Sequence, residues 1–301
     1  MKRREFIHKT ALTSVMVGLP SLPLMSFRSK EIKHITILHT NDTHSHIDPF
    51  DASHPRNPNK GGVVRRATLV EQIRKENPNT LLLDAGDIFQ GTPYFNYYGG
   101  ELEFKLMSMM KYDASTLGNH EFDNGLEGFL APLPHANFDF INSNYDFSNT
   151  ILDGYIKKSK IILMDGIKIG IFGLGIELEG LVSKSHYKET QYLDPIEVAQ
   201  DMTRFLKEDQ ACDLVICLSH LGYKYTSNKV SDVVLASKTK DIDLIIGGHT
   251  HTFLDKPTIV ENRDNKSVIV NQVGCFGINL GRIDFYFQSG KSNSNGRSIE
   301  V

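Results

Sequence analysis

Five short clusters of polar residues in the sequence carry side chains that bind divalent metal ions. Each cluster follows an apolar run that we interpret as a buried strand. They are Asp42-Thr43-His44, Gly86-Asp87, Gly118-Asn119-His120-Glu121, Ser219-His220 and Gly247-Gly248-His249-Thr250-His251. Neutral imidazoles, carboxylates and an amide oxygen are ligands for zinc, manganese, cobalt and iron, and the clusters contain no thiolate. The residue types therefore indicate a metal site built from oxygen and nitrogen donors.

A carboxylate can bridge two cations, and Asp87 is the natural candidate because it lies on a glycine-flanked loop after the most apolar strand. Two cations held roughly 3.5 to 4 Å apart would polarise a phosphoryl group and lower the pKa of a shared water. Any one cluster recurs by chance, and a lone histidine is more often structural than a ligand. The occurrence of all five in order, each after a strand, favours the metal-site interpretation.

The elements that must position these clusters alternate between strand and helix, which predicts an α/β fold. The predicted strands cover residues 35–40, 81–83, 114–117, 138–141, 214–218, 244–246, 258–260, 267–270 and 281–287, and a hairpin joins 160–164 to 168–172 around Asp165-Gly166. The predicted helices cover residues 63–76, 101–110, 125–130 and 195–207. Few helices follow residue 254, so we expect a mixed sheet. Loops at the carboxyl ends of such strands converge on one crevice.

The composition is that of a soluble globular protein, with 301 residues, 40% hydrophobic residues and a formal net charge of −3. This charge does not favour a nucleic-acid polymer as a partner. Cys212, Cys217 and Cys275 have no paired spacing, so we expect ordinary buried thiols. Residues 31–289 are predicted to form one catalytic domain, and residues 290–301 a polar tail, with 288–298 disordered or in a loop tip.

Residues 1–30 have the pattern of an export signal, with a basic start, an apolar stretch over 11–25 and a polar exit. Arg3-Arg4 followed by Glu5-Phe6-Ile7 resembles the twin-arginine signal, although Lys2 stands where that motif prefers a small hydroxyl residue. The apolar stretch is short for a bilayer span. We expect a periplasmic or otherwise exported protein, without a stable membrane span after signal removal.

Five segments, ILHTNDTHSH, LLLDAGDIFQGTPY, STLGNHEFDNG, ICLSHLGY and IIGGHTHTFL, carry a family resemblance. Together they resemble the calcineurin-like metallophosphoesterase superfamily, and within it the catalytic domain of bacterial 5′-nucleotidases and 2′,3′-cyclic nucleotide phosphodiesterases. The resemblance implies a four-layer α/β/β/α sandwich with two mixed β-sheets. It also implies two divalent metal ions and hydrolysis of phosphate monoesters, nucleotides foremost, by attack of a metal-bridging hydroxide.

The same resemblance implies a role for each site residue. Asp42, His44 and His251 would bind the first metal, Asn119, His220 and His249 the second, and Asp87 would bridge them. His120 and Asp123 would form a catalytic dyad, in which His120 stabilises developing charge or assists the leaving oxygen and Asp123 orients its ring. No organic cofactor is implied.

The family's 5′-nucleotidases usually carry a second, C-terminal domain that recognises the nucleoside, whereas this chain stops soon after Phe287. The resemblance therefore leaves three alternatives: a separate polypeptide supplies that domain, an oligomer completes the site, or the enzyme acts with little base selectivity. The first is favoured by analogy. Two other functions stay open, a thiosulfohydrolase like those of sulfur oxidation and a metal-loaded nucleotide- or partner-binding subunit without turnover.

Several other polar and aromatic residues receive structural interpretations. We expect His46 in a solvated loop, His39 buried in its strand, Glu121 as a supporting or helix-entry acid, and Asp84 either supporting Asp87 or bonded to loop amides. Aromatic residues near a strand end are more often packing than base-stacking groups. This applies to Phe89, Tyr94, Tyr97 and Tyr98.

Overall fold

Two six-stranded β-sheets form the centre of the computed structural model, which describes residues 32–301. The first has the order β14 (Lys291–Glu300), β13 (Asn279–Gln288), β1 (Lys33–Thr40), β2 (Thr80–Asp84), β3 (Ala114–Ser115) and β4 (Asp139–Phe140). The second has the order β11 (Thr258–Glu261), β12 (Ser267–Asn271), β10 (Leu244–Gly247), β9 (Leu214–Ser219), β7 (Ile167–Leu174) and β6 (Ser159–Met164). Both contain parallel and antiparallel pairs, which confirms the predicted mixed sheets.

The central strands are buried on both faces, which explains why their apolar runs are continuous. In β1, Ile35 and Ile37 enter the core between the two sheets, while Leu38 faces the opposite side. In β9, Ile216 faces the inter-sheet core and Val215 faces away from it. Successive side chains of a strand point to opposite faces, so a strand buried on both faces must be apolar at nearly every position.

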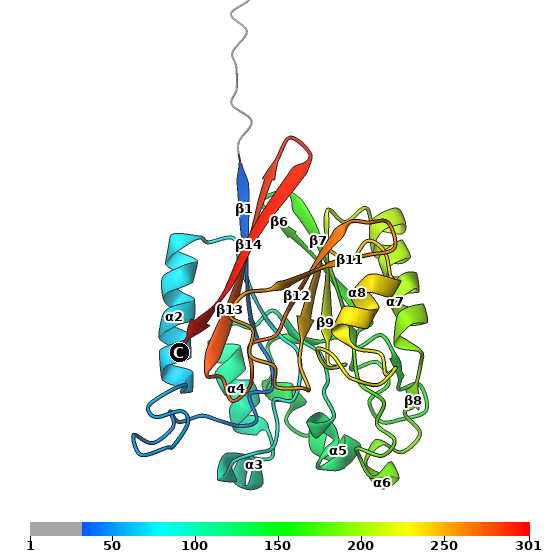
Figure 1. Cartoon of the computed structure of the whole chain (residues 1–301). Coiled ribbons are helices and arrows are strands. Elements are labelled where there is room, and N and C mark those ends of the chain that lie inside the picture. Colours follow the sequence, from blue (N-terminus) through cyan, green and yellow to red (C-terminus); the bar gives the residue numbers. More distant parts are fainter. Residues whose placement is uncertain (1–31) are drawn as a thin grey trace, which may run out of the picture. The chain divides into compact units, whose positions relative to one another are not determined.

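Helices cover the outer face of each sheet (Figure 1). The first sheet is covered by α2 (Val63–Glu76), α4 (Glu101–Met109) and α5 (Gly125–Leu130), which bury side chains such as Val70, Phe104 and Phe129. The second is covered by α7 (Pro195–Arg204) and α8 (Asp232–Lys238), through residues such as Ala199 and Leu235. This arrangement confirms the four-layer α/β/β/α sandwich. Among residues 32–301, none of the helices has both the length and the apolar character needed to cross a bilayer.

Shorter elements connect these strands and helices. They are α3 (Pro93–Tyr98), η1 (His120–Phe122), η2 (Leu133–His135), α6 (Lys184–Tyr187) and the small sheet of β5 (Tyr145–Asp146) and β8 (Gln191–Tyr192). A π-helical turn, η3 (Phe205–Asp209), continues α7. The sequence did not predict α3 or α8, whereas the predicted helices 63–76, 101–110 and 125–130 and the hairpin around Asp165-Gly166 are confirmed.

The carboxyl ends of the central parallel strands lie level with one another. In the first sheet Thr40 pairs with Asp84 and Asp84 pairs with Ser115, and in the second Gly247 pairs with Ser219. Each of the five polar clusters follows one of these strand ends. The register therefore brings residues that are some two hundred positions apart to one edge of the sandwich.

The expectation of a disordered tail at residues 288–298 is wrong. Residues 291–300 form β14, which pairs along its whole length with β13. Ser289 and Gly290 have positive φ angles of 56° and 78°, as in the type I′ turns that join two hairpin strands. Backbone bonds to β13 order this segment, so its polar side chains need not be buried. The predicted export signal at residues 1–30 lies outside the described residues.

Candidate metal centre

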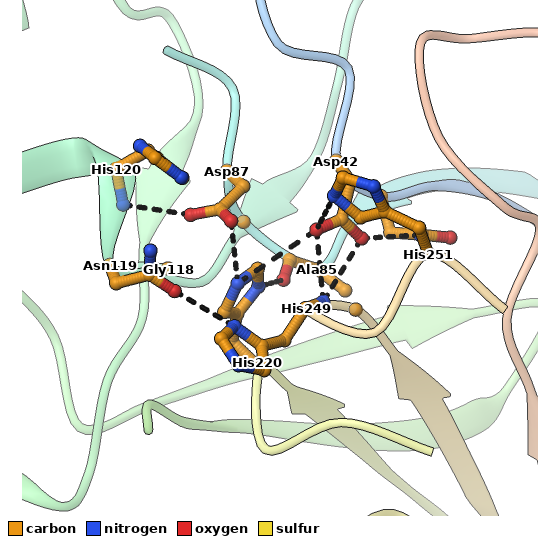
Figure 2. A network of polar contacts seen from close by, with 12 residues as sticks. Asp42, Ala85, Asp87, Gly118, Asn119, His120, His220, His249 and His251 are labelled. Carbon is orange, nitrogen blue, oxygen red and sulfur yellow. Dashed lines mark hydrogen bonds and ion pairs between the residues drawn. The ribbon is translucent and has the colours of Figure 1, made fainter. Parts of the chain in front are cut away.

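The seven side chains predicted as metal ligands converge at the edge where the strands end. Figure 2 shows Asp42 and Asp87 beside each other, with His220 below them and Asn119, His249 and His251 around them. Five of the seven are buried, namely Asp42, His44, Asp87, Asn119 and His220. The structure thus brings together all the residues of the proposed set, and their roles as ligands stay predictions.

Asp87 lies between the two predicted groups of ligands. Its Oδ2 is 3.0 Å from Nε2 of His220 and 3.9 Å from Nε2 of His44. Its Oδ1 accepts a hydrogen bond of 2.8 Å from the backbone amide of His120 (Figure 2). One carboxylate oxygen therefore faces a histidine from each group, a position from which Asp87 could bridge two cations.

The first predicted group, Asp42, His44 and His251, offers three donor atoms within 4.8 Å of one another. Oδ1 of Asp42 is 3.3 Å from Nε2 of His251 and 3.9 Å from Nε2 of His44. The two histidine Nε2 atoms are 2.9 Å apart. Metal–ligand distances of about 2.0 to 2.2 Å place donors around one ion at roughly this spacing.

The second predicted group is centred on His220. Asp87, His220 and His249 offer donor atoms within 4.8 Å of one another, and Oδ1 of Asn119 is 2.9 Å from Nδ1 of His249. The backbone amide of His249 donates to both oxygens of Asp42, at 2.9 and 3.1 Å. The loop after β10 is thereby tied to the loop after β1.

Hydrogen bonds behind the ligands fix which nitrogen of two histidines faces the centre. Nδ1 of His220 donates to the carbonyl oxygen of Ala85 at 2.6 Å, and Nδ1 of His44 donates to that of Phe89 at 3.1 Å. Each bond leaves the Nε2 lone pair directed at the carboxylates. Supporting bonds of this kind are usual for metal-binding histidines.

The electrostatic environment of His220 favours a positive charge at its ring. Burial lowers its pKa, but the carboxylates of Asp87 and Asp42 outweigh burial and raise that pKa to about 10. The effect is mutual. His220 helps to hold the pKa of Asp87 well below its usual range, although burial of Asp87 acts in the opposite direction. A proton and a cation would therefore compete for this centre.

Strained backbone accompanies these residues. Asp42, His44, Asp87, His249 and His251 have positive φ angles of 48°, 47°, 55°, 71° and 50°. Such a conformation costs a non-glycine residue roughly 1 to 2 kcal/mol, and clustered strain of this kind is typical of functional sites. The residue types alone did not predict this feature.

The predicted catalytic pair also meets in the structure. Nδ1 of His120 donates to Oδ2 of Asp123 at 2.7 Å, and both side chains are partly exposed. This hydrogen bond is the main reason that the pKa of His120 is raised, and burial opposes it. His120 also lies within reach of His44 and Asp87, so its ring faces the same space as the predicted ligands.

Glu121 holds the loop that carries Asp87. Its Oε2 accepts from the backbone amides of Asp87 and Gly118 at 2.9 and 2.6 Å, and its Oε1 accepts from those of Ile88 and Phe89 at 2.7 and 3.3 Å. The side chain is buried. The expected supporting role is therefore confirmed, through four backbone contacts that sequence alone could not specify.

Two amide side chains that the sequence analysis missed hold other ligand loops. Asn41 donates from Nδ2 to Oδ2 of Asp42 at 2.6 Å and accepts from the amide of Val273 at 3.0 Å. Gln272 accepts at Oε1 from the hydroxyl of Thr250 at 3.1 Å and donates to the carbonyl of Gly248. Both follow strand ends, which is the signal that would have identified them.

Among the residues given structural interpretations, most are placed as expected. Phe89 packs in the core, and Asp84 accepts bonds from the Gly86 amide and from the hydroxyls of Thr40 and Ser115. The expected packing is wrong for Tyr97 and Tyr98, which are 84% and 54% exposed. The cysteines are free and buried.

Two histidines outside the ligand set differ in how far they match expectation. His39 is buried as expected, and its Nε2 contacts the side chain of Asn271 at 2.8 Å. The expectation of a solvated His46 is wrong, since its ring is half-buried and lies 4.3 Å from that of Phe276.

The donors fit divalent cations. Nε2 of His220 is buried beside Asp87 without meeting the geometry of a hydrogen bond. The Nε2 atoms of His44 and His251 face each other. Because Nδ1 of His44 donates its proton to the carbonyl of Phe89, Nε2 of His44 carries a lone pair. Cations between these nitrogens and the carboxylates would satisfy all of them.

Comparisons with known proteins show what this chain is similar to. A family model described as calcineurin-like phosphoesterase matches residues 35–253. The chain is 36% identical to the trifunctional nucleotide phosphoesterase protein YfkN of Bacillus subtilis over 86% of its length, and 36% identical to a snake venom 5′-nucleotidase of Crotalus adamanteus over 84%. It spans only 19% of the first relative and 45% of the second. A solved 5′-nucleotidase precursor of Thermus thermophilus superposes with a TM-score of 0.81 at 32% identity, over 89% of this chain and 55% of that one.

Proposed function

This chain belongs to the calcineurin-like phosphoesterase family, and from that membership we propose that it is a metal-dependent hydrolase of phosphate monoesters, with nucleotides as the preferred class. The observation that carries the proposal is the position of Asp87, whose Oδ2 lies within 4 Å of a histidine nitrogen from each ligand group. Relatives named as nucleotide phosphoesterases and 5′-nucleotidases support the substrate class.

Seven residues would hold a pair of divalent cations, of which zinc, manganese, cobalt and iron suit the donors. They are Asp42, His44 and His251 on one side, Asn119, His220 and His249 on the other, and Asp87 between them. When bound, such a pair polarises the phosphoryl group and generates a water nucleophile at neutral pH. In the hydrolysis, the oxygen of water bonds to phosphorus, the bond from phosphorus to the ester oxygen breaks, and that oxygen leaves with the electron pair and takes up a proton.

His120 and Asp123 would serve the leaving oxygen. The hydrogen bond from Nδ1 to Asp123 fixes the ring, so that Nε2 is the atom available to a substrate. Because Asp123 raises the pKa of His120, the ring keeps its proton to higher pH and can donate it or stabilise the charge that develops on the phosphoryl group. The partial exposure of both side chains leaves room for this contact.

The test is phosphate release by purified protein loaded with Mn²⁺, Zn²⁺ or Co²⁺, on nucleoside monophosphates and on an aryl phosphate. The proposal predicts turnover that Asp87→Asn abolishes and that the exposed Asp153→Asn leaves unchanged. Turnover of a thiosulfonate substrate alone would indicate a thiosulfohydrolase, and tight nucleotide binding without turnover would indicate a binding subunit. The panel is run with and without a separately supplied substrate-binding domain, because the nucleotidase relatives are longer than the matched region.

We also propose that residues 1–30 direct the protein out of the cytoplasm, on the basis of Arg3-Arg4 and the apolar stretch that follows. Replacing both arginines by lysine should retain the precursor inside the cell. N-terminal sequencing of the protein from a periplasmic fraction would locate the cleavage point. An uncleaved, cytoplasmic protein in the parent strain would contradict the proposal.

A further inference from the structure

Four aromatic rings extend as a row from the candidate metal centre. The ring of Phe276 lies 5.9 Å from that of His44, and His46 follows at 4.3 Å from Phe276. Phe50 lies 5.0 Å from His46, and His54 lies 4.5 Å from Phe50. We call Phe276, His46, Phe50 and His54 the ring row. All four residues are half-buried, whereas His44 beside the inner end is buried, so the row is partly open to solvent.

The inner end of the row is held by strained backbone. Phe276 has a φ of 62°, which is unusual for a bulky residue, and its amide donates to the carbonyl of Asp42 at 2.7 Å. This conformation places the ring beside both His44 and His251, at 5.9 and 5.8 Å between centroids. Strain of this kind persists where the surrounding structure imposes it, commonly at ligand-binding positions.

The outer end of the row is also built into the fold. The amide of Phe50 donates to the carbonyl of Lys60 at 2.9 Å, and the amide of Asn59 donates to the carbonyl of Phe50 at 3.1 Å. Nδ1 of His54 accepts from the amide of Asn57 at 3.0 Å. The loop after the first ligand cluster is therefore closed by its own hydrogen bonds. A preformed surface loses little conformational entropy when a ligand binds to it.

We propose that the ring row binds the planar aromatic part of the substrate's leaving group, a nucleobase or an aryl ring, while the phosphoryl group lies at the metal centre. This inference rests on the proposed function and assigns substrate selection to residues of this chain. Continuity with the centre supports it, because Phe276 touches two predicted ligands and the remaining rings follow outwards. Stacking is tolerant of base identity, so the row would favour nucleotides and aryl phosphates over aliphatic esters.

Phe50 is the position for a test because its ring contacts the row without contacting a predicted ligand. Phe50→Leu removes the ring and keeps an apolar side chain, and Phe50→Tyr restores a ring. The matched control is Tyr286→Leu, which removes a ring stacked 4.4 Å from His34 at the opposite end of the first sheet. Kinetic constants are measured for metal-loaded enzyme with adenosine 5′-phosphate and with glycerol 2-phosphate.

The expected result is a KM for adenosine 5′-phosphate that rises roughly 5- to 150-fold in Phe50→Leu, the range that loss of one stacking contact gives. The KM of Phe50→Leu for glycerol 2-phosphate should change less than about twofold, because this substrate has no ring to stack. In Phe50→Tyr and Tyr286→Leu the KM values for both substrates should also change less than about twofold, because neither variant loses a stacking contact with the substrate. Equal losses on both substrates in Phe50→Leu would overturn the inference and leave the proposed hydrolysis standing.

Binding of free adenosine, followed by isothermal titration calorimetry, tests the row without turnover. Wild-type protein and Phe50→Tyr should bind adenosine, and Phe50→Leu should bind it at least about fivefold more weakly. If the wild-type protein hydrolyses neither phosphoester, the proposed function fails and this titration still decides the inference. Absence of adenosine binding by the wild-type protein, or equal binding by Phe50→Leu, would overturn it.

Discussion

The carboxylate of Glu121 accepts a hydrogen bond of 2.9 Å from the backbone amide of Asp87, and this contact joins the loops that follow two neighbouring strands. Three further amides, of Gly118, Ile88 and Phe89, bond to the same carboxylate. The carboxylate that faces both groups of histidines is therefore held in place from behind. A residue with no direct contact to substrate can in this way control the geometry of the centre.

Changing Glu121 to Gln should destabilise the protein, because an amide NH₂ would then face backbone N–H groups that need an acceptor. Leaving buried donors unsatisfied costs about 1 to 3 kcal/mol, which is the expected loss in the free energy of unfolding. Urea unfolding at pH 7 measures it. The exposed Glu179→Gln is the control, and coincident unfolding curves for the two variants would contradict this role.

Gly118→Ala should remove metal binding while preserving the fold. A Cβ at this position would lie 2.1 Å from Oδ1 of Asp87 and 2.7 Å from its backbone nitrogen, so the ligand loop must move. The control is Gly180→Ala, whose Cβ meets no atom within 4 Å although its φ is +80°. Metal content after dialysis is the measurement. A full complement of metal in Gly118→Ala would show that the close packing around Asp87 does not matter for binding.

Asp123→Asn should move the alkaline limb of the pH–rate profile to lower pH. Asp123 raises the pKa of His120 chiefly through their hydrogen bond, so the ring keeps its proton further into the alkaline range when Asp123 is present. Without the carboxylate the protonated form is lost at lower pH, and catalysis that needs it is lost too. His120→Ala should lower kcat by about 10²- to 10⁴-fold. An unshifted profile in Asp123→Asn would exclude this partnership.

Asp232→Asn should change how stability depends on pH. Asp232 is buried, with Oδ1 bonded to Ser219 at 2.5 Å and Oδ2 without a partner, and burial raises its pKa to about 8. Between about pH 4 and pH 8 the folded protein therefore holds one more proton than the unfolded chain, so stability falls as pH rises.

The loss reaches at most about 1.4 kcal/mol per pH unit. The variant lacks this proton, so its free energy of unfolding should rise relative to that of the parent across the window. Urea unfolding of chelator-treated protein at pH 5, 6 and 7 measures the difference, and parallel profiles would show that Asp232 is ionised throughout.

The strands and the ligand clusters could be predicted because both leave local signals. Residues such as Leu82 and Val215 continue an apolar run that needs burial on two faces, and the clusters begin where such runs stop. The mixed sheets followed from the scarcity of helices after residue 254. These features depend on neighbours in sequence, which is why the positions of the strands along the chain, and the strand ends that the polar clusters follow, could be predicted.

The features that were missed depend on contacts between distant residues. β14 is polar and is ordered by backbone bonds to β13, which composition does not reveal. Phe276 contacts His46 across more than two hundred positions, so no local pattern indicates an aromatic ring beside His46. Asp42 and Asp87 likewise adopt left-handed backbone, which aspartate tolerates but which no local signal at these positions predicted.

The central claim is that seven side chains hold two cations with Asp87 between them, and anomalous X-ray diffraction from crystals soaked in Mn²⁺ tests it most directly. Two anomalous peaks about 3.5 to 4 Å apart are expected, one beside Asp42, His44 and His251 and the other beside Asn119, His220 and His249, with Asp87 contacting both. A single peak that excludes one of these groups, or peaks away from Asp87, would contradict the account.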